Sequence, residues 1–390
     1  MPEPNGRTAA DSSIDQMTTA TYERSTAQNV SREGNAMDIT SIDHLELYVE
    51  DGEQVAARLQ QAYGFTVQGR GGPETGLTGR RSILLRQRGI TLVVTTAVDG
   101  HHGAAEYVRR HGDGVAVVGV AVADARAAFT EAVERGAYPM APPVVHGRRG
   151  ASATFASVRG FGDVELRFTS RDTPDTPFDP GVVEETAVAS PGGLLEAVDH
   201  LAVLVPAGDL DKTVRRYVEV FGLTQTFEER IQVGKQAMDS KVVANESGTV
   251  TFTLIEPDTT RDPGQIDAFL DAHGGAGVQH IAFRTGDITR SVCDVSAAGV
   301  RFLDTPSRYY DALDDRLGAV GVPLATLREL NVLADRDHWG VMLQIFTRSE
   351  HPRRTLFYEL IDRRGARTFG SNNIKALYEA VDRSAPREDL

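Results

Sequence analysis

The sequence is poor in cysteine. A single cysteine, Cys293, occurs in 390 residues. One thiol excludes an intramolecular disulfide framework and a thiolate metal cage, and so little cysteine is typical of a reducing cytoplasm. Any bound metal must therefore be held by nitrogen and oxygen ligands.

Long apolar runs and an excess of positive charge are missing too. No apolar segment approaches the roughly 20 residues that cross a bilayer, and the N-terminal stretch lacks the hydrophobic region of a secretory signal. We therefore expect a cytoplasmic protein. With Lys+Arg 41 against Asp+Glu 55, the net charge is −14. Such a chain is repelled by nucleic acid and by anionic membranes, so we expect a small-molecule partner and neither of those two.

The chain repeats itself. The segment "IDHLELYV" recurs as "VDHLAVLV", and each alternates like a half-buried strand before a helical segment that stops at Gly64 or Gly222. Next, "SILLRQRGITLVVTTA" matches "KVVANESGTVTFTLIEP" as two strands, and "GDGVAVVGVAVADARAAFTEAVERGA" matches "GAGVQHIAFRTGDITRSVCDVSAAGV" as strand then helix. The last match pairs "GFGDVELRFTSR" with "HWGVMLQIFTR". The order predicts an α+β protein with two tandem βαβββ modules in each half.

The repeat also sets the expected domains. The segment "DTPDTPFDPGVVEETAVASPGG" is rich in Pro, Gly and acidic residues, as linkers are. The first residues are rich in Ser, Thr, Asn and Gly and poor in large apolar residues, as disordered tails are. We predict a disordered tail over 1–38, an N-terminal domain over 39–171, a linker over 172–193 and a C-terminal domain over 194–390.

Three residues of the second half form a candidate metal site. His44 and His200 occupy matching places in the two halves, but the position that matches His280 is Val117. A strand-like apolar run carries Glu359, whose unpaired burial would be costly. Two histidines and one carboxylate are the ligands of facial-triad iron(II) sites.

The pattern leaves a structural alternative open. A buried histidine is more often a hydrogen-bonded core residue than a ligand, and a strand glutamate usually faces solvent. The spacing of His200 and His280 matches no local metal motif. Because His44 has only Val117 as a counterpart to His280, we interpret His44 as structural.

The sequence resembles a known family over nearly its whole length after the tail. The segments that carry the resemblance to the 4-hydroxyphenylpyruvate dioxygenase family are "GVQHIAF", "FLDTPSRYYDALDDRL", "VLADRDHWGVMLQIFTR", "RRTLFYELIDRRGA" and "FGSNNIKALYEAV". The resemblance implies a two-domain vicinal oxygen chelate fold, in which the βαβββ modules form an incomplete barrel in each half and only the C-terminal barrel holds Fe(II). It places His200, His280 and Glu359 on the iron ligands. It also implies an assembly of identical chains, a homodimer or larger.

The family carries out two chemistries on 4-hydroxyphenylpyruvate and O2. Both release carbon dioxide; one branch then oxidises the ring to give homogentisate, and the other hydroxylates the benzylic carbon to give 4-hydroxymandelate. Since cofactor and oxidant are shared, the pocket must aim the substrate. The second branch implies a role in making hydroxyphenylglycine for a peptide antibiotic, and (S) product stereochemistry.

Pocket residues favour the hydroxymandelate-forming branch. Homogentisate-forming members usually have Pro-Leu-Asn-Glu where this chain has "FTLIEP", with Thr253 and Ile255, and a phenylalanine where it has Ile374. The segments "GKQAMDSKVV" and "FGSNNIKALYEAV" also resemble that branch. Drift in core packing would be an alternative reason for the two isoleucines. By the same resemblance, further positions near the substrate or iron are Ser240, Gln265, Gln344, Phe369 and Asn373.

Two competing functions stay open at this point. One is the homogentisate-forming dioxygenase of tyrosine catabolism, which product identity would separate. The other is a non-catalytic small-molecule binding protein of the same fold, since duplicated modules of this kind also bind without catalysis. Zinc competes with Fe(II) for such ligands in vitro because the affinity order favours zinc.

Overall fold

The first half of the chain forms one mixed sheet with helices. The computed structural model describes residues 37–186, 192–311, 313–370, 373 and 375–376. The elements are β1 (Ser41–Tyr48), α1 (Gly52–Tyr63), β2 (Thr66–Gly71), the 3-10 helix η1 (Pro73–Thr75), β3 (Arg80–Gln87), β4 (Ile90–Ala97), α2 (Gly103–His111), β5 (Gly114–Ala121), α3 (Ala125–Glu134), β6 (Pro139–Arg148), β7 (Ala151–Arg159), β8 (Glu165–Arg171) and β9 (Glu184–Glu185). The strand order is β6-β7-β8-β5-β1-β4-β3-β2-β9.

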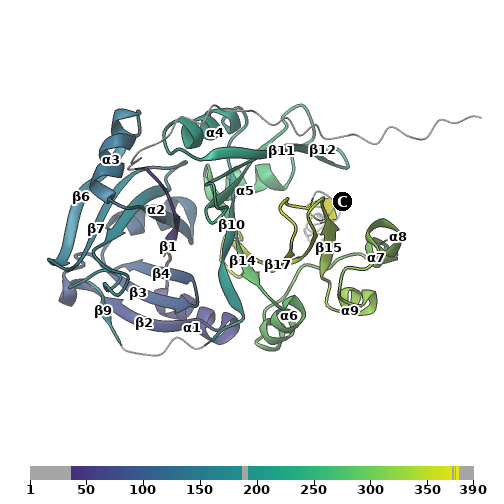
Figure 1. Ribbon diagram of the computed structural model, residues 1–390, viewed down its shortest axis with the longest axis horizontal. Helices are drawn as coiled ribbons and strands as arrows, with labels where there is room; N and C mark the ends of the chain where they lie inside the picture. Colours follow the sequence, from purple (N-terminus) through teal and green to yellow (C-terminus); the bar gives the residue numbers. More distant parts are fainter. Residues whose placement is uncertain (1–36, 187–191, 312, 371–372, 374, 377–390) are drawn as a thin grey trace, which may run out of the picture. The chain divides into compact units, whose positions relative to one another are not determined.

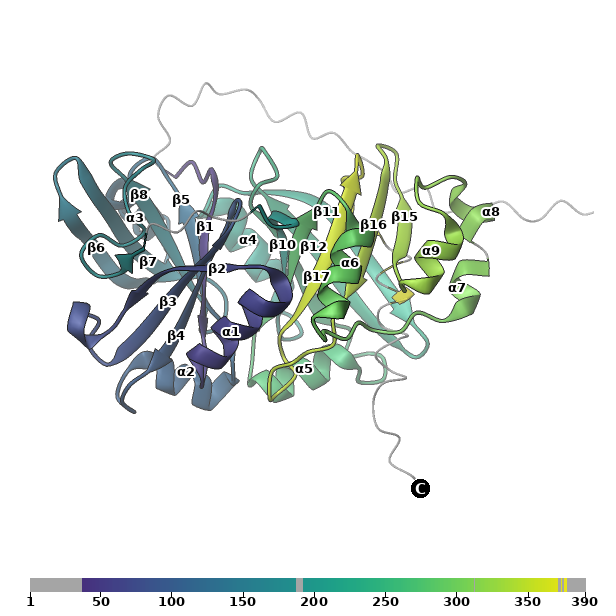
Figure 2. The ribbon, with the colours of Figure 1, turned by 90° about the horizontal axis from the view of Figure 1, so that it is seen from below.

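The second half forms a second mixed sheet. The elements are β10 (Leu195–Leu204), α4 (Leu210–Glu219), β11 (Thr224–Val233), β12 (Gln236–Ala244), β13 (Thr251–Pro257), α5 (Gln265–His273), β14 (Gly277–Thr285), α6 (Ile288–Ala297), α7 (Ser307–Asp311), α8 (Leu313–Leu317), α9 (Leu324–Glu329), β15 (Leu333–Arg336), β16 (Val341–Phe346) and β17 (Phe357–Arg364). The order is β11-β12-β13-β10-β14-β17-β16-β15. Figure 1 shows β10, β14 and β17 at the centre of this curved sheet, and Figure 2 shows α6 across β17.

The two strand orders are the same once the second is reversed, and among the described strands only β9 has no counterpart. Each half is therefore two βαβββ modules, and the predicted α+β vicinal oxygen chelate fold is confirmed.

One match in the repeat was wrong. The segment "GFGDVELRFTSR" forms β8, which pairs with β5 in parallel as β17 pairs with β14. Its counterpart is therefore β17, and not β16 with the sequence "VMLQIF".

Local sequence explains the helix that follows the first strand. The Asp51 side chain accepts a hydrogen bond from the Gln54 backbone N–H and caps the start of α1, and Gly64, with φ of 76°, ends it in the left-handed region. In the stretch predicted as a linker, Phe178 and Val183 are buried against Leu84 of β3 and Val93 of β4. None of the helices in the described residues is long and apolar enough to span a membrane.

Strand alternation separates an apolar core from a polar interior. On β17, Tyr358 and Leu360 lie in the main core cluster, which includes residues of both halves, whereas Glu359 points to the opposite face. On β14, Ile281 and Phe283 lie in the same core cluster, and His280 faces the other way. The two halves thus bury their apolar faces together, and each sheet keeps its polar face for its own interior.

The ends of α2 and α5 meet where the halves join. The rings of His111 and His273, the last residues of these two matching helices, stack with centroids 4.5 Å apart. The His111 Nδ1 lies 2.7 Å from the His273 carbonyl oxygen. Arg353 donates hydrogen bonds to the carbonyls of Arg109, Arg110 and Ala272, and so caps both helix ends.

We expect the protein to lose stability in mild acid because of His273 at this junction. Burial, together with the neighbouring His111, lowers the pKa of His273 from 6.5 to about 4. As the pH falls from 6.5 towards 4, the unfolded chain binds a proton that the folded chain refuses, so the free energy of unfolding decreases. The full shift corresponds to about 3 kcal/mol. We expect urea unfolding measured at several pH values to show a shallower slope in this window for His273→Gln, and equal slopes would contradict the assignment.

Candidate metal centre

The register of three central strands brings the predicted metal ligands together. His200 on β10 pairs with Ala282 on β14, and Ala282 pairs with Glu359 on β17. His280 precedes Ala282 by two residues and therefore points to the same face. The small Ala282 side chain leaves the space over β14 open to the flanking His200 and Glu359.

Two β-bulges place a polar residue beside each histidine. The register shifts between Val198 and His200 leave Asp199 as the extra residue, and a second shift leaves Gln279 as the extra residue before His280. A bulge lets neighbouring residues point to one face. The Asp199 Oδ1 lies 2.9 Å from the His200 Nδ1, and the Gln279 Oε1 lies 3.3 Å from the His280 Nδ1.

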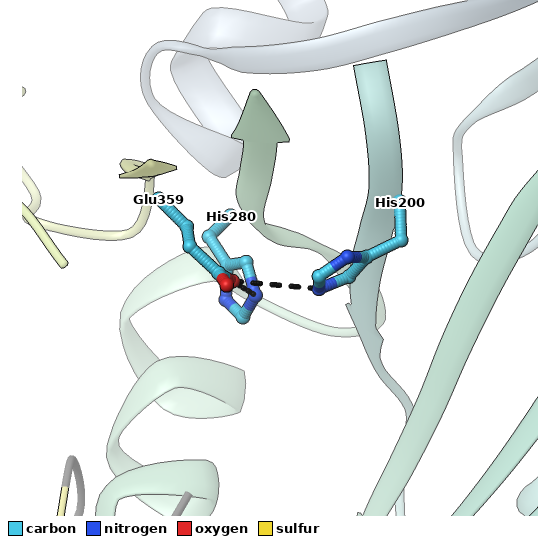
Figure 3. Close-up of side chains that lie close together, drawn as sticks. All are labelled: His200, His280 and Glu359. Atoms are coloured by element: carbon cyan, nitrogen blue, oxygen red, sulfur yellow. Dashed lines mark ion pairs between the residues drawn. The ribbon is translucent and has the colours of Figure 1, made fainter. Parts of the chain in front are cut away.

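With Nδ1 bonded in this way, both histidines turn Nε2 towards Glu359. The Oε2 of Glu359 lies 3.4 Å from Nε2 of His200 and 3.3 Å from Nε2 of His280. Figure 3 shows the three side chains pointing to a common centre from different strands. Their ligand atoms all lie within 4.8 Å of one another, and all three side chains are buried.

The electrostatics of this cluster favour positive charge. Burial opposes a charged imidazole, but the Glu359 and Asp199 carboxylates outweigh it and raise the pKa of His200 to about 9. Burial likewise opposes the Glu359 carboxylate, yet His200 lowers the pKa of Glu359. For His280 burial dominates and lowers its pKa. A neutral His280 keeps the Nε2 lone pair that a metal ligand needs.

A cavity opens from the three ligands. It is lined by His200, Thr253, Ile255, Gln279, His280, Gln344, Phe346, Glu359, Ile361 and Phe369. Within the part of the chain that the structure describes, four of its buried polar atoms have no hydrogen-bond partner. These atoms are Thr253 Oγ1, His280 Nε2, Gln344 Oε1 and Glu359 Oε1. Buried polar atoms are rarely left without partners, so the four mark a place for a polar ligand or ion.

The other predicted pocket residues lie at different places. Thr253, Ile255, Gln344 and Phe369 line the cavity. Three more lie outside this lining: Ser240 is buried on β12 opposite Ile255, Gln265 begins α5, and Asn373 is buried and accepts a hydrogen bond from Tyr309. Ile374 lies outside the described residues. The roles predicted for all eight in substrate binding stay predictions.

Sequence reasoning missed two neighbours of the ligands. Asp199 and Gln279 each precede a predicted ligand histidine and contact its Nδ1. In a regular strand, adjacent side chains point to opposite faces. The sequence alone therefore does not indicate that either residue contacts the histidine that follows it. The repeated Asp-His pairs of "IDHL" and "VDHL" were the available signal, since an acid next to a metal-binding histidine commonly orients its ring.

A larger hollow of ≈ 930 Å³ lies away from the three ligands, along α1 and the segment 350–352. Its arginines are already paired: Arg58 with Glu350, Arg70 with Glu53, and Arg81 with Glu74. Because each of these arginines is neutralised by a carboxylate, none of the three offers a free positive charge to a substrate. The larger size of this hollow is therefore not evidence that it is the functional site.

The ligand set fits a divalent transition metal. Two imidazole nitrogens and one carboxylate oxygen, with bond lengths of about 2.1 Å, lie about 3 Å apart when they occupy adjacent positions around one ion. The observed separations between histidine and Glu359 of 3.3 and 3.4 Å are close to this spacing. All three ligands can thus bind one ion and leave the remaining positions to a substrate.

The fold and this ligand set together define the vicinal oxygen chelate class of metal-dependent enzymes. Residues 199–317 match the model of the Glyoxalase/Bleomycin resistance protein/Dioxygenase superfamily, and residues 34–177 match the N-terminal model of hydroxyphenylpyruvate dioxygenase.

Similar proteins narrow the class to one family. The chain is 31% identical to 4-hydroxyphenylpyruvate dioxygenase of Danio rerio, over 87% of this chain and 89% of that protein. It is 30% identical to the probable 4-hydroxyphenylpyruvate dioxygenase 2 of Aspergillus fumigatus, over 94% and 99%. A solved mutant of 4-hydroxymandelate synthase from Streptomyces coelicolor is 45% identical, with a TM-score of 0.82 over 89% of this chain and 99% of that one. The chain belongs to the 4-hydroxyphenylpyruvate dioxygenase family.

Proposed function

We propose that the protein converts 4-hydroxyphenylpyruvate and O2 to (S)-4-hydroxymandelate and CO2, with Fe(II) held by His200, His280 and Glu359. The substrate carboxyl group leaves as CO2. One oxygen atom of O2 enters the new carboxylate, and the other becomes the benzylic hydroxyl. No further reductant is needed, because oxidation of the 2-oxo acid supplies the electrons.

The degree of similarity carries this proposal. The chain is 45% identical to a hydroxymandelate synthase, against 31% and 30% for relatives named 4-hydroxyphenylpyruvate dioxygenase, with comparable coverage. Ile255 lies on the cavity wall and supports the same branch, because by the family resemblance a hydrocarbon side chain stands where the homogentisate-forming branch usually has an asparagine amide. The wall at Ile255 guides the ring by shape, without a hydrogen bond.

The residues around the cavity have distinct roles in this reaction. Fe(II), when bound, supplies open positions for the 2-oxo acid and O2 and the redox chemistry that they need. The Gln344 and Thr253 side chains offer polar atoms that have no partner among the described residues. Phe369, whose ring lies 5.0 Å from that of His200, covers the ligand. Burial of these groups excludes bulk water from the reacting centre.

The test is aerobic turnover of 4-hydroxyphenylpyruvate by protein reconstituted with Fe(II) and ascorbate. Chiral chromatography with mass detection resolves the products, and O2 uptake is followed in parallel. We expect (S)-4-hydroxymandelate with O2 and substrate consumed in equal amounts. Homogentisate as the main product would establish the other branch, and binding of substrate without O2 uptake would establish a binding protein.

Replacement of Thr253 by valine is expected to increase stability and to weaken substrate binding. Thr253→Val keeps the shape of the side chain and removes a buried hydroxyl that has no hydrogen-bond partner in the described part of the chain. An unpaired buried polar group costs about 1–3 kcal/mol, so we expect urea unfolding without substrate to show a gain of about 1 kcal/mol. Loss of a hydrogen bond to substrate should raise KM about tenfold. A stability loss together with unchanged KM would show that Thr253 only packs.

A further inference from the structure

Four side chains form one connected unit behind the metal centre. The Asp199 carboxylate accepts from His200 Nδ1 at 2.9 Å and from the Arg363 Nε at 2.9 and 3.0 Å. Arg363 also donates to the Thr368 carbonyl at 2.7 Å, and its guanidinium lies 5.1 Å from the Phe369 ring centroid. The ring of Phe369 meets that of His200 edge to face, at 87°. We call Asp199, His200, Arg363 and Phe369 the C-terminal quartet.

The first half contains a similar unit. Its Asp, His and Arg match those of the C-terminal quartet by strand register, and its Phe lies in the segment after β8. The His44 Nδ1 lies 2.7 Å from Asp43 Oδ2, and Arg171 pairs with Asp43. Arg171 donates to the Phe178 carbonyl at 3.1 Å and lies 5.5 Å from the Phe178 ring centroid. The rings of His44 and Phe178 meet at 5.0 Å and 89°. A bulge at Asp43 matches the one at Asp199. We call Asp43, His44, Arg171 and Phe178 the N-terminal quartet.

What faces the histidine differs between the halves. By strand register, Val117 matches His280 and Arg167 matches Glu359. The Arg167 Nη1 lies 3.5 Å from His44 Nε2 and 2.9 Å from the Oε2 of Glu46. The N-terminal quartet therefore faces a guanidinium, whereas the C-terminal quartet faces the metal centre.

The first half also fixes the histidine tautomer. The Asp43 carboxylate can only accept, so its 2.7 Å contact places a proton on Nδ1 of His44, and the neutral ring then turns its Nε2 lone pair towards the donor Arg167. This is the tautomer that a metal ligand bound through Nε2 needs. An Asp-His-Arg-Phe unit thus directs the Nε2 of its histidine to a guanidinium in the first half and to the candidate metal centre in the second.

We propose that Asp199 and Arg363 are positioning residues of the metal centre, which hold the Nε2 lone pair of His200 on the ion and hold Phe369 over the substrate. The inference rests on the proposed function, in that it assigns a metal to His200. Arg363 is suited to this double role because its planar guanidinium binds the carboxylate through two nitrogen atoms, reaches a carbonyl and stacks on a ring at once. A lysine cannot replace these contacts.

The test compares Asp199→Asn with Asp43→Asn, and Arg363→Lys with Arg171→Lys. The two members of each pair remove the same contacts from matching buried units, but only one lies next to the metal centre. Co(II) alone serves as the probe, titrated calorimetrically without substrate, and urea unfolding is measured on the same samples. We expect Asp199→Asn and Arg363→Lys to weaken Co(II) binding about 10–100-fold, as loss of a group that orients a ligand does. The variants of the first half should bind Co(II) within about twofold of wild type, with similar losses of unfolding midpoint in each pair.

Substrate kinetics test the link to Phe369. We expect Arg363→Lys to raise KM at saturating Fe(II), and Arg171→Lys to leave KM unchanged. Unaltered Co(II) affinity in both second-half variants, or equal weakening by their first-half counterparts, would overturn the positioning role. Failure of the wild-type protein to bind Co(II) would instead refute the proposed metal-dependent function. Should Asp199→Asn not fold, the arginine pair decides the question alone.

Discussion

Replacement of Glu359 by glutamine should leave a folded protein that neither holds its metal nor turns over substrate. The side chain is 1% exposed and its Oε2 lies within 3.4 Å of both predicted ligand histidines. A glutamine has nearly the same shape but no charge, so the attraction between the site and a cation is lost. Even residues that only orient a ligand change affinity 10–100-fold, so we expect a loss of metal affinity and of kcat/KM beyond about 100-fold.

The matched control for this variant is Glu46→Gln. Glu46 is also buried, at 3% exposure, and pairs with Arg167 in the interior of the first half. Loss of its charge leaves a buried guanidinium short of a partner, so stability falls while Co(II) affinity stays at the wild-type value. Calorimetric Co(II) titration and Fe(II)-dependent O2 uptake measure both variants. Wild-type metal affinity in Glu359→Gln would exclude Glu359 as a ligand.

The repeat in the sequence predicted two matching α+β halves, and the resemblance to a known family supplied the vicinal oxygen chelate fold. Matching strands and helical segments gave two βαβββ modules per half, and the strand orders confirm it. The same repeat equated His44 with His200 and Val117 with His280, and the strand register supports both pairings. These residues could be matched because each lies in a strand beside similar neighbours in both halves, where local pattern alone sets the alignment.

The counterpart of Glu359 could not be found in this way. The last strands of the two halves have diverged, and the segment that forms β8 was matched to β16 instead of β17. Only the pairing of β8 with β5 shows that Arg167 is the residue in question. The bulges at Asp199 and Gln279 were hidden for a similar reason: a bulge is defined by the partner strand, which is distant in sequence.

Phe283→Ala should cause a large loss of stability. Phe283 lies on β14, on the face opposite His280, and belongs to the main core cluster. Its side chain has no exposure, and its ring lies 5.9 Å from Phe65 of the first half and 5.5 Å from Tyr358 of β17. Truncation would open a cavity between the two halves that rigid strands on either side cannot close. Such changes cost about 3–5 kcal/mol.

Because Phe283 and His280 point to opposite faces of β14, the damage should stay out of the metal centre. We expect urea unfolding, followed by circular dichroism, to show the full loss, while Co(II) affinity of the folded protein stays within about twofold of wild type, as for changes that share no contacts. Val98→Ala, at a side chain that is 53% exposed, controls for the loss of apolar surface and should change stability by less than about 0.5 kcal/mol. A loss below about 1 kcal/mol for Phe283→Ala would mean that the joined apolar faces rearrange to fill the space, and that the two halves are held together mainly by polar contacts such as those of Arg353 with the carbonyls of Arg109 and Arg110.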